Sequence, residues 1–464
     1  MGPSGGERLD KRSVVATLLS PRRFRLRHPA QFVVAGFAGT ISVGTLLLML
    51  PVATSGRGGA PFLTAVFTAT SATCVTGLIV VDTPVYWTTF GEVVILLLIQ
   101  LGGFGIMTVG SLIGLLLSRR IGLRQRMTAR AERNALDLGG VREVLLRVAG
   151  FSVAFESLAA VIITVRLWTA YDEPLGTAAY HGVFHAVSAF NNAGFSLYSD
   201  NLVGFVSDAW ICLTIAFAII FGGIGFPVLN ELKGNLGDPS RWTLHTKLTI
   251  ATTAVLLVVG TLAFVAFEWT NPDTLGPLDT LDSLLASFFQ GVQPRTAGFN
   301  SVDTSALNDS TLLVSSALML IGAGSASTGG GIKVTTFALL AFVIWSEMRG
   351  DQEVSLFGRR TPSAIQRQAL SVALLGLGAG VIGTFSLLSV AEVGMGSALY
   401  EAFSAFGTVG LSTGITPSLP AIAKVTLIVL MFLGRVGPVT LFAALVLRQR
   451  QRLYRFPEER PIVG

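Results

Sequence analysis

The stretch FTATSATCVTGL, from Phe67 to Leu78, has three altered copies further along the chain. They are FHAVSAFNNAGF from Phe184, FFQGVQPRTAGF from Phe288 and YEAFSAFGTVGL from Tyr400. In all four copies an aromatic residue precedes a glycine by ten positions, and these glycines are Gly77, Gly194, Gly298 and Gly410. Four ungapped copies indicate an internal repeat, each unit of which contains one short segment that ends at a glycine.

Long apolar runs flank each copy. Hydrophobic residues make up 51% of the chain and charged residues 13%, about half the share that is typical of a soluble domain. A helix that spans a bilayer needs about 20 apolar residues. The runs that reach or nearly reach this length are 31–53, 87–117, 144–169, 209–232, 245–268, 311–346 (interrupted), 368–391 and 421–447. The sequence therefore predicts eight transmembrane helices, with four shorter apolar pieces near 61–72, 180–190, 280–290 and 397–406.

The basic residues predict which side of the membrane each loop occupies. Most of the 33 Lys and Arg residues fall within 8–27, 119–147, 233–247, 349–367 and 448–460. Cytoplasmic loops carry such an excess of Lys and Arg. We therefore expect a multi-pass protein of the cell membrane, whose two termini are cytoplasmic and whose four short apolar pieces face the outside.

Each unit then consists of a helix, a short re-entrant piece and a second helix (an M–P–M unit). Because every unit begins and ends on the same side, all four share one orientation and are related by an axis along the membrane normal. The predicted fold class is an all-α polytopic membrane protein, with eight transmembrane helices and four re-entrant pore helices in pseudo-fourfold symmetry around a central pore. The expected segments are a cytoplasmic N-terminal tail (1–28), unit 1 (29–118), a cytoplasmic linker (119–143), unit 2 (144–234), unit 3 (235–350), unit 4 (351–447) and a cytoplasmic C-terminal tail (448–464).

The short segments predict an ion pathway. Non-helical backbone is stable at membrane depth only where protein buries it or where it lines a water-filled cavity. Four short helices around one axis would point their partly negative C-terminal ends at the centre. The glycine-containing strands that follow would turn carbonyl oxygens inward, and carbonyl oxygens can replace the hydration shell of an alkali cation. Asp82, Asp200 and Asp303 would attract cations to the outer mouth, unless they are ordinary solvated loop residues.

The predicted second helix of unit 3 has a polar interruption, LIGAGSASTGGGIKVTT, from Leu320 to Thr336. A flexible polar run cannot face lipid, and a place beneath the glycine segments would put it in the ion path. We therefore predict an intramembrane gating loop at 322–333, which contains Gly322, Gly324, Ser325, Ser327, Thr328, Gly329, Gly330, Gly331 and Lys333. The stretches LGGFG from Leu101, FGGIG from Phe221 and LGRVG from Leu433 predict that the other three second helices are loosened at a similar depth.

Three of the charged residues within predicted spans need an explanation, namely Arg435, Lys333 and Glu156. Arg435 takes the place that Gly103 and Gly223 occupy in units 1 and 2. It would point into the pore, either as an electrostatic barrier or as a tether that donates to the loop. Snorkelling toward the cytoplasm is the alternative. Lys333 is placed for either gating or snorkelling, and the role of Glu156 stays open.

Four M–P–M units in one chain, each with one glycine turn, resemble the Trk/Ktr/HKT superfamily of potassium transporters. The ending RFPEERPIVG and the eight spans are most similar to the Ktr-type membrane subunits of that superfamily. The resemblance implies that the four turns form a selectivity filter whose carbonyl groups bind the ion. The implied filter residues are Thr73, Cys74, Val75, Thr76, Gly77, Asn191, Asn192, Ala193, Gly194, Arg295, Thr296, Ala297, Gly298, Gly407, Thr408, Val409 and Gly410. A serine in place of the first filter glycine often accompanies sodium transport in the superfamily, so Gly77 favours potassium.

The resemblance also implies a function and partners. The chain would be the ion-translocating membrane subunit of a potassium uptake system, working as a homodimer with a cytosolic ring of nucleotide-binding (RCK) subunits. K+ is the transported ion, while coupling to Na+ stays open, and we expect neither a covalently bound cofactor nor a nucleic-acid partner. The basic run from Arg119 to Glu143 would contact either membrane lipid headgroups or the regulatory subunits.

Two other functions fit the sequence less well. A sodium-selective or poorly selective cation channel of the same fold would use the same glycines. A polytopic membrane enzyme would need acid, base or metal-ligand side chains gathered at one depth. The sequence contains no G-x-x-x-x-G-K-[ST] loop, no zinc-ligand spacing and no dinucleotide fingerprint. We therefore expect a transport protein without enzymatic activity.

Overall fold

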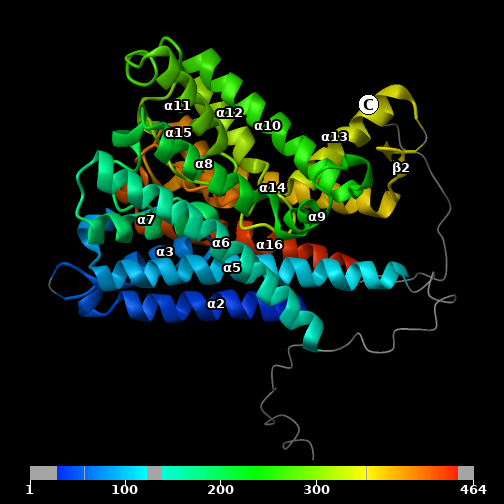
Figure 1. Ribbon diagram of the computed structural model, residues 1–464, viewed down its shortest axis with the longest axis horizontal. Coiled ribbons are helices and arrows are strands. Elements are labelled where there is room, and N and C mark those ends of the chain that lie inside the picture. The colour runs from blue at the N-terminus through cyan, green and yellow to red at the C-terminus, as the bar shows by residue number, and fades with distance from the viewer. Residues whose placement is uncertain (1–28, 57, 123–137, 352, 448–464) are drawn as a thin grey trace, which may run out of the picture.

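The computed structural model of the chain describes residues 29–56, 58–122, 138–351 and 353–447. The expected tails at 1–28 and 448–464, and most of the expected linker at 119–143, lie outside the described residues. Helices dominate the structure, and α2 (Pro29–Leu48) and α5 (Thr89–Gly122) run side by side along the longest axis of the molecule (Figure 1).

Six of the described helices are long and apolar enough to cross a membrane. They are α2, α5, α6 (Leu138–Ala170), α10 (Leu244–Glu268), α14 (Ser363–Val390) and α16 (Ala421–Leu447). A seventh span results if α8 (Ala209–Ile224) and α9 (Phe226–Asn235), which form a bent pair, are taken together. The protein is therefore a helical membrane protein.

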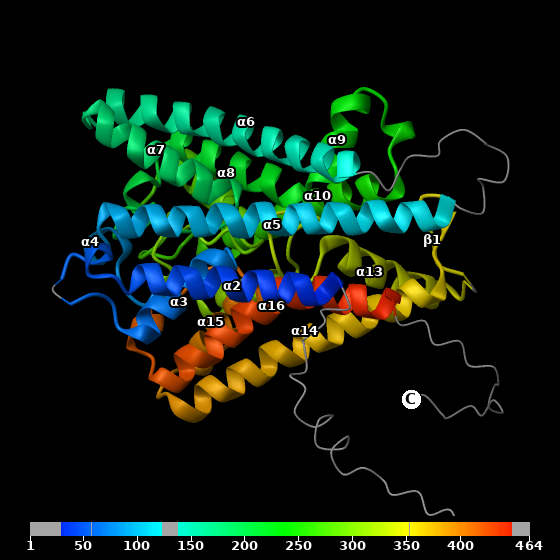
Figure 2. The ribbon, with the colours of Figure 1, turned by 90° about the horizontal axis from the view of Figure 1, so that it is seen from below.

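Four shorter helices alternate with the long ones. They are α3 (Phe62–Thr73), α7 (Leu175–Phe190), α11 (Thr280–Val292) and α15 (Met395–Gly407). Each packs against the long helix that precedes it in the chain. The last part of the chain returns to the first, because α16 packs against α2 and α3 (Figure 2). This return places the four short helices around one interior region.

The helix expected at 209–232 is bent by 98° between α8 and α9. Gly225 stands at the bend with a φ of 101°, a backbone conformation that only glycine adopts readily. Pro227 follows in the first turn of α9, where its missing amide hydrogen costs nothing. The run expected at 311–346 is likewise divided into α12 (Asp309–Leu320) and α13 (Val334–Arg349), with residues 321–333 between them.

The predicted loosening is wrong for α5 and α16, which continue unbroken through LGGFG and LGRVG. Their glycines instead allow the short helices to come close. A methyl group built on Gly102 would lie 1.9 Å from the Thr73 carbonyl oxygen. One built on Gly434 would lie 1.7 Å from the Phe406 oxygen. These glycines therefore serve helix contact, as small residues commonly do in membrane proteins.

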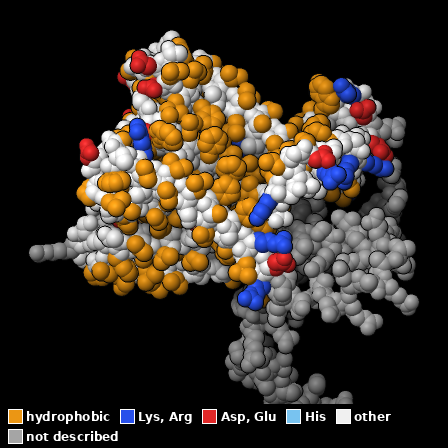
Figure 3. Space-filling view, in the orientation of Figure 1, with side chains coloured by type: hydrophobic (Ala, Val, Ile, Leu, Met, Phe, Trp, Pro, Cys, Tyr) orange, Lys and Arg blue, Asp and Glu red, His pale blue; other side chains and the backbone are white. Residues whose placement is uncertain are grey.

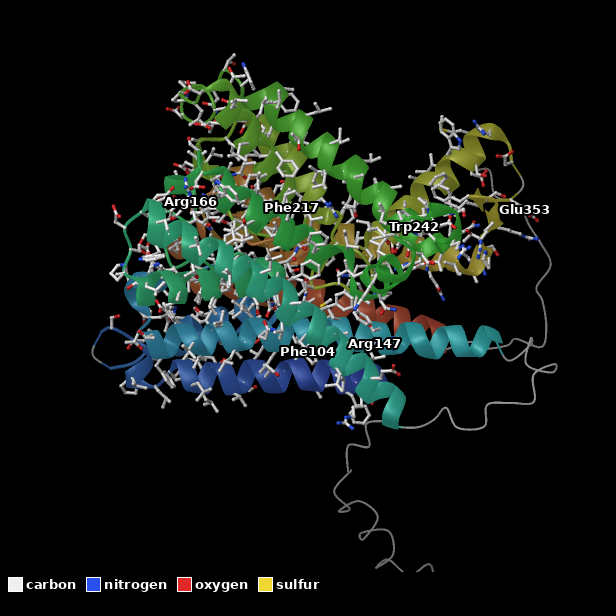
Figure 4. The ribbon with its side chains drawn as sticks, in the orientation of Figure 1. Phe104, Arg147, Arg166, Phe217, Trp242 and Glu353 are labelled. Carbon is white, nitrogen blue, oxygen red and sulfur yellow. The ribbon has the colours of Figure 1, made fainter. Side chains whose placement is uncertain are left out.

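The remaining described elements are short. They are α4 (Thr83–Tyr86), the 3-10 helices η1 (Pro51–Ala53), η3 (Val203–Phe205), η4 (Pro239–Arg241), η5 (Thr304–Ala306) and η6 (Thr416–Ser418), and an antiparallel hairpin of β1 (Ser355–Leu356) and β2 (Arg359–Arg360). The hairpin was not predicted from the sequence. On the visible face, Lys and Arg gather mainly at the end that α9, α13 and the hairpin form, and hydrophobic side chains cover most of the rest (Figure 3). Trp242 and Glu353 lie at that end and Arg166 at the other (Figure 4).

Candidate functional site

The four short helices lead into turns with the same backbone pattern. Two positions before each glycine stands a residue with positive φ: Val75 at 56°, Asn192 at 61°, Thr296 at 69° and Thr408 at 52°. The glycines that follow have φ values of 96° for Gly77, 68° for Gly194, 80° for Gly298 and 96° for Gly410. Positive φ is uncommon outside glycine and is strained for β-branched residues such as valine and threonine. Because this rare conformation recurs at all four places, the turns are structurally equivalent.

The turns follow one another in a closed ring. In each turn, a methyl group built on the glycine would meet the carbonyl oxygen of the residue before the next glycine. The distances are 2.4 Å from Gly77 to Ala193, 2.8 Å from Gly194 to Ala297, 2.4 Å from Gly298 to Val409 and 2.0 Å from Gly410 to Thr76. Since the fourth turn returns to the first, the four glycines surround a common centre, and no side chain fits between neighbouring turns.

The turn amides donate back to the short helices. The amides of Thr76, Ala193 and Val409 donate to the carbonyl oxygens of Ser71, Ser188 and Ser404, with N···O distances of 2.8, 2.7 and 2.8 Å. In the third turn, Gln293 is the residue that accepts hydrogen bonds from the turn amides. Its carbonyl oxygen accepts from the Ala297 amide at 3.1 Å, and its side-chain oxygen accepts from the Phe299 amide at 3.0 Å. The serine register is visible in the sequence, whereas Gln293 was missed because it stands one position later.

The carbonyl oxygens at the ring accept no hydrogen bond from the part of the chain that the structure describes. Among the described residues, no N–H or O–H group lies within hydrogen-bond distance of the oxygens of Thr76, Ala193, Ala297 or Val409, all of which belong to fully buried residues. A buried carbonyl oxygen that no donor satisfies costs free energy. A dehydrated cation at the centre would satisfy these oxygens, as it does where rings of backbone carbonyls bind ions.

Side chains next to the ring turn away from it. Arg295 donates to Thr253 on α10, through Nη1 to the carbonyl oxygen at 3.4 Å and through Nη2 to Oγ1 at 3.3 Å. Asn191 donates to side chains of α5 and α6. Cys74 is a buried free thiol. These implied filter residues therefore contribute backbone, rather than side chains, to the ring.

Residues 321–333, which we call the loop, lie against the ring. Ile321 and Ile332 pair as a parallel bridge at its base. A methyl group built on Gly329 would lie 2.2 Å from Thr296 Oγ1, and one built on Gly330 would lie 2.2 Å from Thr408 Oγ1. The glycines of the loop thus contact the third and fourth turns directly.

The bend at Gly225 provides hydrogen-bond acceptors for the loop. Carbonyl groups at the end of a helix lack partners within it. Those of Gly222 and Gly223 accept from the loop amides of Thr328 at 3.2 Å and Gly324 at 2.7 Å. The end of α8 therefore holds the loop in place.

The Thr328 side chain connects the loop to the second turn. Its Oγ1 lies 3.0 Å from the side-chain amide of Asn192 and 3.3 Å from the Phe190 carbonyl oxygen. Elsewhere in the loop, Ser327 Oγ donates to the Gly324 oxygen at 2.6 Å, and Ser325 Oγ lies 3.1 Å from Thr335 Oγ1. The loop therefore contacts three of the four turns.

Two basic side chains donate to the loop. Arg435, which is 1% exposed, donates through Nη1 to the Thr328 carbonyl oxygen and through Nη2 to the Gly102 oxygen at 3.0 Å. Lys333 Nζ donates to the carbonyl oxygens of Gly329 and, at 3.3 Å, Gly330. Both side chains are therefore directed at carbonyl groups of the loop, Arg435 from α16 and Lys333 from within the loop itself.

The three acids expected at the outer mouth have local partners or stand at a helix start. Asp303 accepts from Ser305, with its amide at 2.9 Å and its hydroxyl at 2.8 Å, and Asp200 accepts from the Gly204 amide at 3.0 Å. Asp82 precedes α4 and makes no side-chain cap. For Asp200 and Asp303, these local hydrogen bonds are those expected of ordinary solvated loop residues, which is the alternative to attracting cations at the outer mouth.

Comparison with known proteins covers nearly the whole chain. The model of the TrkH family, described as "Cation transport protein", matches residues 13–452. "Ktr system potassium uptake protein B" of Bacillus subtilis is 42% identical over 436 residues, which cover 94% of this chain and 97% of the relative. "Potassium/sodium uptake protein NtpJ" of Enterococcus hirae is 33% identical over 455 residues, which cover 97% of this chain and all of the relative.

A solved structure has the same fold. The crystal structure of the potassium transporter TrkH from Vibrio parahaemolyticus matches with a TM-score of 0.72 at 17% identity, covering 93% of this chain and 87% of that one. The resemblance predicted from the glycine repeats is thus confirmed at the level of the family. Since the family model and two full-length relatives agree, the chain belongs to the TrkH family of cation transport proteins.

Proposed function

We propose that this chain is the ion-translocating membrane subunit of a potassium uptake system. The proposal rests on the closed ring of four glycine turns, whose buried carbonyl oxygens have no hydrogen-bond partner among the described residues. The names of the relatives from Bacillus subtilis and Enterococcus hirae, potassium uptake and potassium/sodium uptake, support the same cargo. A protein that only lowers the barrier to ion passage needs no catalytic residues, so we propose no enzymatic activity.

The four turns at 73–77, 191–194, 295–298 and 407–410 form the selectivity filter. An ion that enters from the outside loses water at the ring, and backbone oxygens take the place of that water. The turns differ in sequence, so the side chains that surround the carbonyl oxygens differ from one unit to the next. We therefore expect one dominant ion site at the ring and a selectivity looser than that of a filter built from four identical strands.

Residues 322–333 of the loop act as the gate of this pathway. The loop lies against three turns, and its position depends on the hydrogen bond from Arg435 and on the carbonyl groups at the end of α8. Lys333 holds the shape of the loop from within. In this arrangement the loop obstructs passage beneath the ring. Movement of the loop out of the path must break its hydrogen bonds to Arg435 and to the end of α8, so Arg435 is a tether in the closed state.

The finer architecture is also part of the proposal. Four M–P–M units with the boundaries expected from the sequence surround the pore in pseudo-fourfold symmetry, and α12, the loop and α13 together make the eighth span. Both termini are cytoplasmic. Two copies of the chain work with a cytosolic ring of nucleotide-binding subunits, which moves the loop, and ion gradients drive transport.

A sodium-permeable pathway of the same fold is the second candidate. The relative named for potassium/sodium uptake favours it, because that relative matches over its whole length. The two candidates differ in how strongly the ring discriminates K+ from Na+, which transport measurements resolve directly.

The substitution Gly77→Ser tests the proposed filter. A side chain at Gly77, where φ is 96°, would lie 2.4 Å from the Ala193 oxygen and would displace the first turn from the second. We expect discrimination between K+ and Na+ to fall about tenfold, which corresponds to about 1.4 kcal/mol. The measurement is competitive uptake of K+ and Na+ in a strain that lacks its own potassium uptake systems.

Gly105→Ala is the matched control for this experiment. Gly105 lies in α5, and nothing lies within 4 Å of a methyl group built there. The control should keep the wild-type ratio. Wild-type selectivity in the Gly77→Ser variant would contradict the assignment of the filter.

A further inference from the structure

Glu156 lies in the middle of α6, where an ionisable side chain is costly because the surroundings are apolar. The residue is buried, with 8% of its surface exposed. None of the ion pairs in the described part of the chain includes it. A buried carboxylate without a cation depends on hydrogen bonds from neutral donors. The identity of these donors therefore indicates what the residue does.

The donors of Glu156 are the side-chain amides of two residues from other elements. Oε1 accepts from Asn191 Nδ2 at 3.1 Å, and Oε2 accepts from Gln100 Nε2 at 3.3 Å. Gln100 Oε1 in turn accepts from Asn191 Nδ2 at 2.8 Å. The three side chains form a closed triangle that joins α5, α6 and the first residue of the second filter turn.

The surroundings of the triangle are shaped for Asn191. A methyl group built on Gly103 of α5 would lie 2.0 Å from Asn191 Oδ1, so a side chain there would displace the amide. Asn191 Nδ2 also donates to the Val187 carbonyl oxygen of its own helix at 2.9 Å. Contacts from three elements thus fix the orientation of this one amide.

The second turn connects the fixed Asn191 side chain to the loop through the next residue, Asn192. Asn192, the next residue, has a φ of 61°, and its side-chain amide lies 3.0 Å from Thr328 Oγ1. The Thr328 carbonyl oxygen accepts from Arg435. Of the two consecutive asparagines, Asn191 therefore contacts Glu156 of α6, and Asn192 contacts Thr328 of the loop.

We propose that Glu156 is a positioning residue, which orients the second filter turn through Asn191 and, through Asn192, sets the contact between that turn and the loop. The inference rests on the proposed function, because it assigns Glu156 to the same ring and the same gate. Glu156 does not touch the ion, so its effect on transport is exerted through the backbone at 191–194.

The substitution Glu156→Gln tests this inference in the full-length chain. Glutamine has the same size, but its NH2 group would face the donors of Gln100 or Asn191 and would break one side of the triangle. We expect discrimination between K+ and Na+ to fall roughly tenfold, about 1.4 kcal/mol. We also expect the change in uptake to be non-additive with that of Thr328→Val, because both substitutions act on the second turn.

Glu92→Gln is the matched control. Glu92 lies on α5, is buried like Glu156 and accepts from Tyr180 Oη of α7 at 2.6 Å, a hydrogen bond that glutamine can also accept. It makes no described contact with residues 191–194. The control should keep wild-type selectivity and should be additive with Thr328→Val.

A second variant keeps the test decisive if Glu156→Gln does not fold. Gln100→Ala removes the two sides of the triangle that Gln100 makes with Glu156 and Asn191, at a partly exposed position, and leaves the hydrogen bond between Asn191 and the carboxylate in place. It should lower discrimination in the same direction as Glu156→Gln. Unchanged selectivity in whichever variant folds, or additivity with Thr328→Val, would overturn the role of Glu156.

The Gly77→Ser variant separates this failure from failure of the proposed function. If Gly77→Ser lowers discrimination while Glu156→Gln and Gln100→Ala do not, the filter stands and Glu156 has only a packing role. If none of the three changes selectivity, the filter assignment and the inference are both wrong.

Discussion

Replacing Gly410 by alanine is expected to reduce potassium uptake about 100-fold, the largest loss of any single change to the ring. Gly410 has a φ of 96°, where a side chain costs about 1–3 kcal/mol in backbone strain. Its new methyl group would also lie 2.0 Å from the Thr76 carbonyl oxygen, the shortest of the four approaches at the ring. The fourth turn would have to withdraw from the first. We expect this to open the ring and remove the ion site.

Gly414→Ala is the control that separates the effect of backbone strain from that of the steric clash with the Thr76 oxygen. Gly414 also has a positive φ, 85°, but nothing lies within 4 Å of a methyl group built there. The same backbone strain without the collision should leave uptake within about threefold of wild type. The measurement is uptake of K+ per copy of protein in the membrane, with the elution profile of the purified protein as the check on folding. Near-normal uptake by a folded Gly410→Ala variant would contradict the closed ring.

Replacing Arg435 by glutamine should raise the resting flux about 10- to 100-fold. The guanidinium group donates to the Thr328 oxygen of the loop and, at 3.0 Å, to the Gly102 oxygen of α5. A hydrogen bond to a charged group contributes about 1.5–3 kcal/mol, and about 1.4 kcal/mol corresponds to a tenfold change in an equilibrium. Without these contacts, the loop would leave its position beneath the ring more often. The measurement is rubidium flux into vesicles that contain the membrane subunit alone.

Arg166→Gln is the control for the tether. Arg166 lies near the C-terminal end of α6, where its Nε donates to Asp208 Oδ2 at 2.7 Å (Figure 4). It has no described contact with the loop. Its substitution should not raise the flux. An Arg435→Gln variant that is folded but conducts no more than wild type would show that the arginine does not hold the gate closed.

The repeated features of the fold could be predicted from the sequence because they are local. Apolar runs and their lengths predict the long helices, and an aromatic residue ten positions before a glycine identifies all four turns. The polar run at 322–333 predicts a break that the structure has between Leu320 and Val334. Each of these predictions needed only residues that stand close together in the chain.

Contacts between distant parts of the chain could not be predicted. Gln100 and Asn191 stand far apart in the sequence, so their hydrogen bond depends on how α5 and α7 pack. The glycines of LGGFG were predicted to loosen a helix, yet Gly102 and Gly103 make room for Thr73 and Asn191. A glycine can permit either a bend or a close approach, and only packing decides between the two.

The bend at Gly225 illustrates the same limit. Gly225 and Pro227 are a local signal for a helix break, but LGRVGP in α16 has a similar pattern and remains helical, with Pro438 inside the helix. At Gly225, a methyl group would lie 2.6 Å from the Ser325 oxygen, so the loop occupies the space beside the bend. Neighbouring segments therefore decide whether such a pattern breaks a helix.

The position of a bound ion tests the central claim most directly. Crystals of the full-length protein in thallium or rubidium salts, examined by anomalous diffraction, would locate the ion independently of the protein map. We expect a strong peak at the centre of the ring, within coordination distance of carbonyl oxygens from all four turns, those of Thr76, Ala193, Ala297 and Val409 among them. A ring that is empty while ions occupy other sites, or a peak that contacts only one or two turns, would contradict the account.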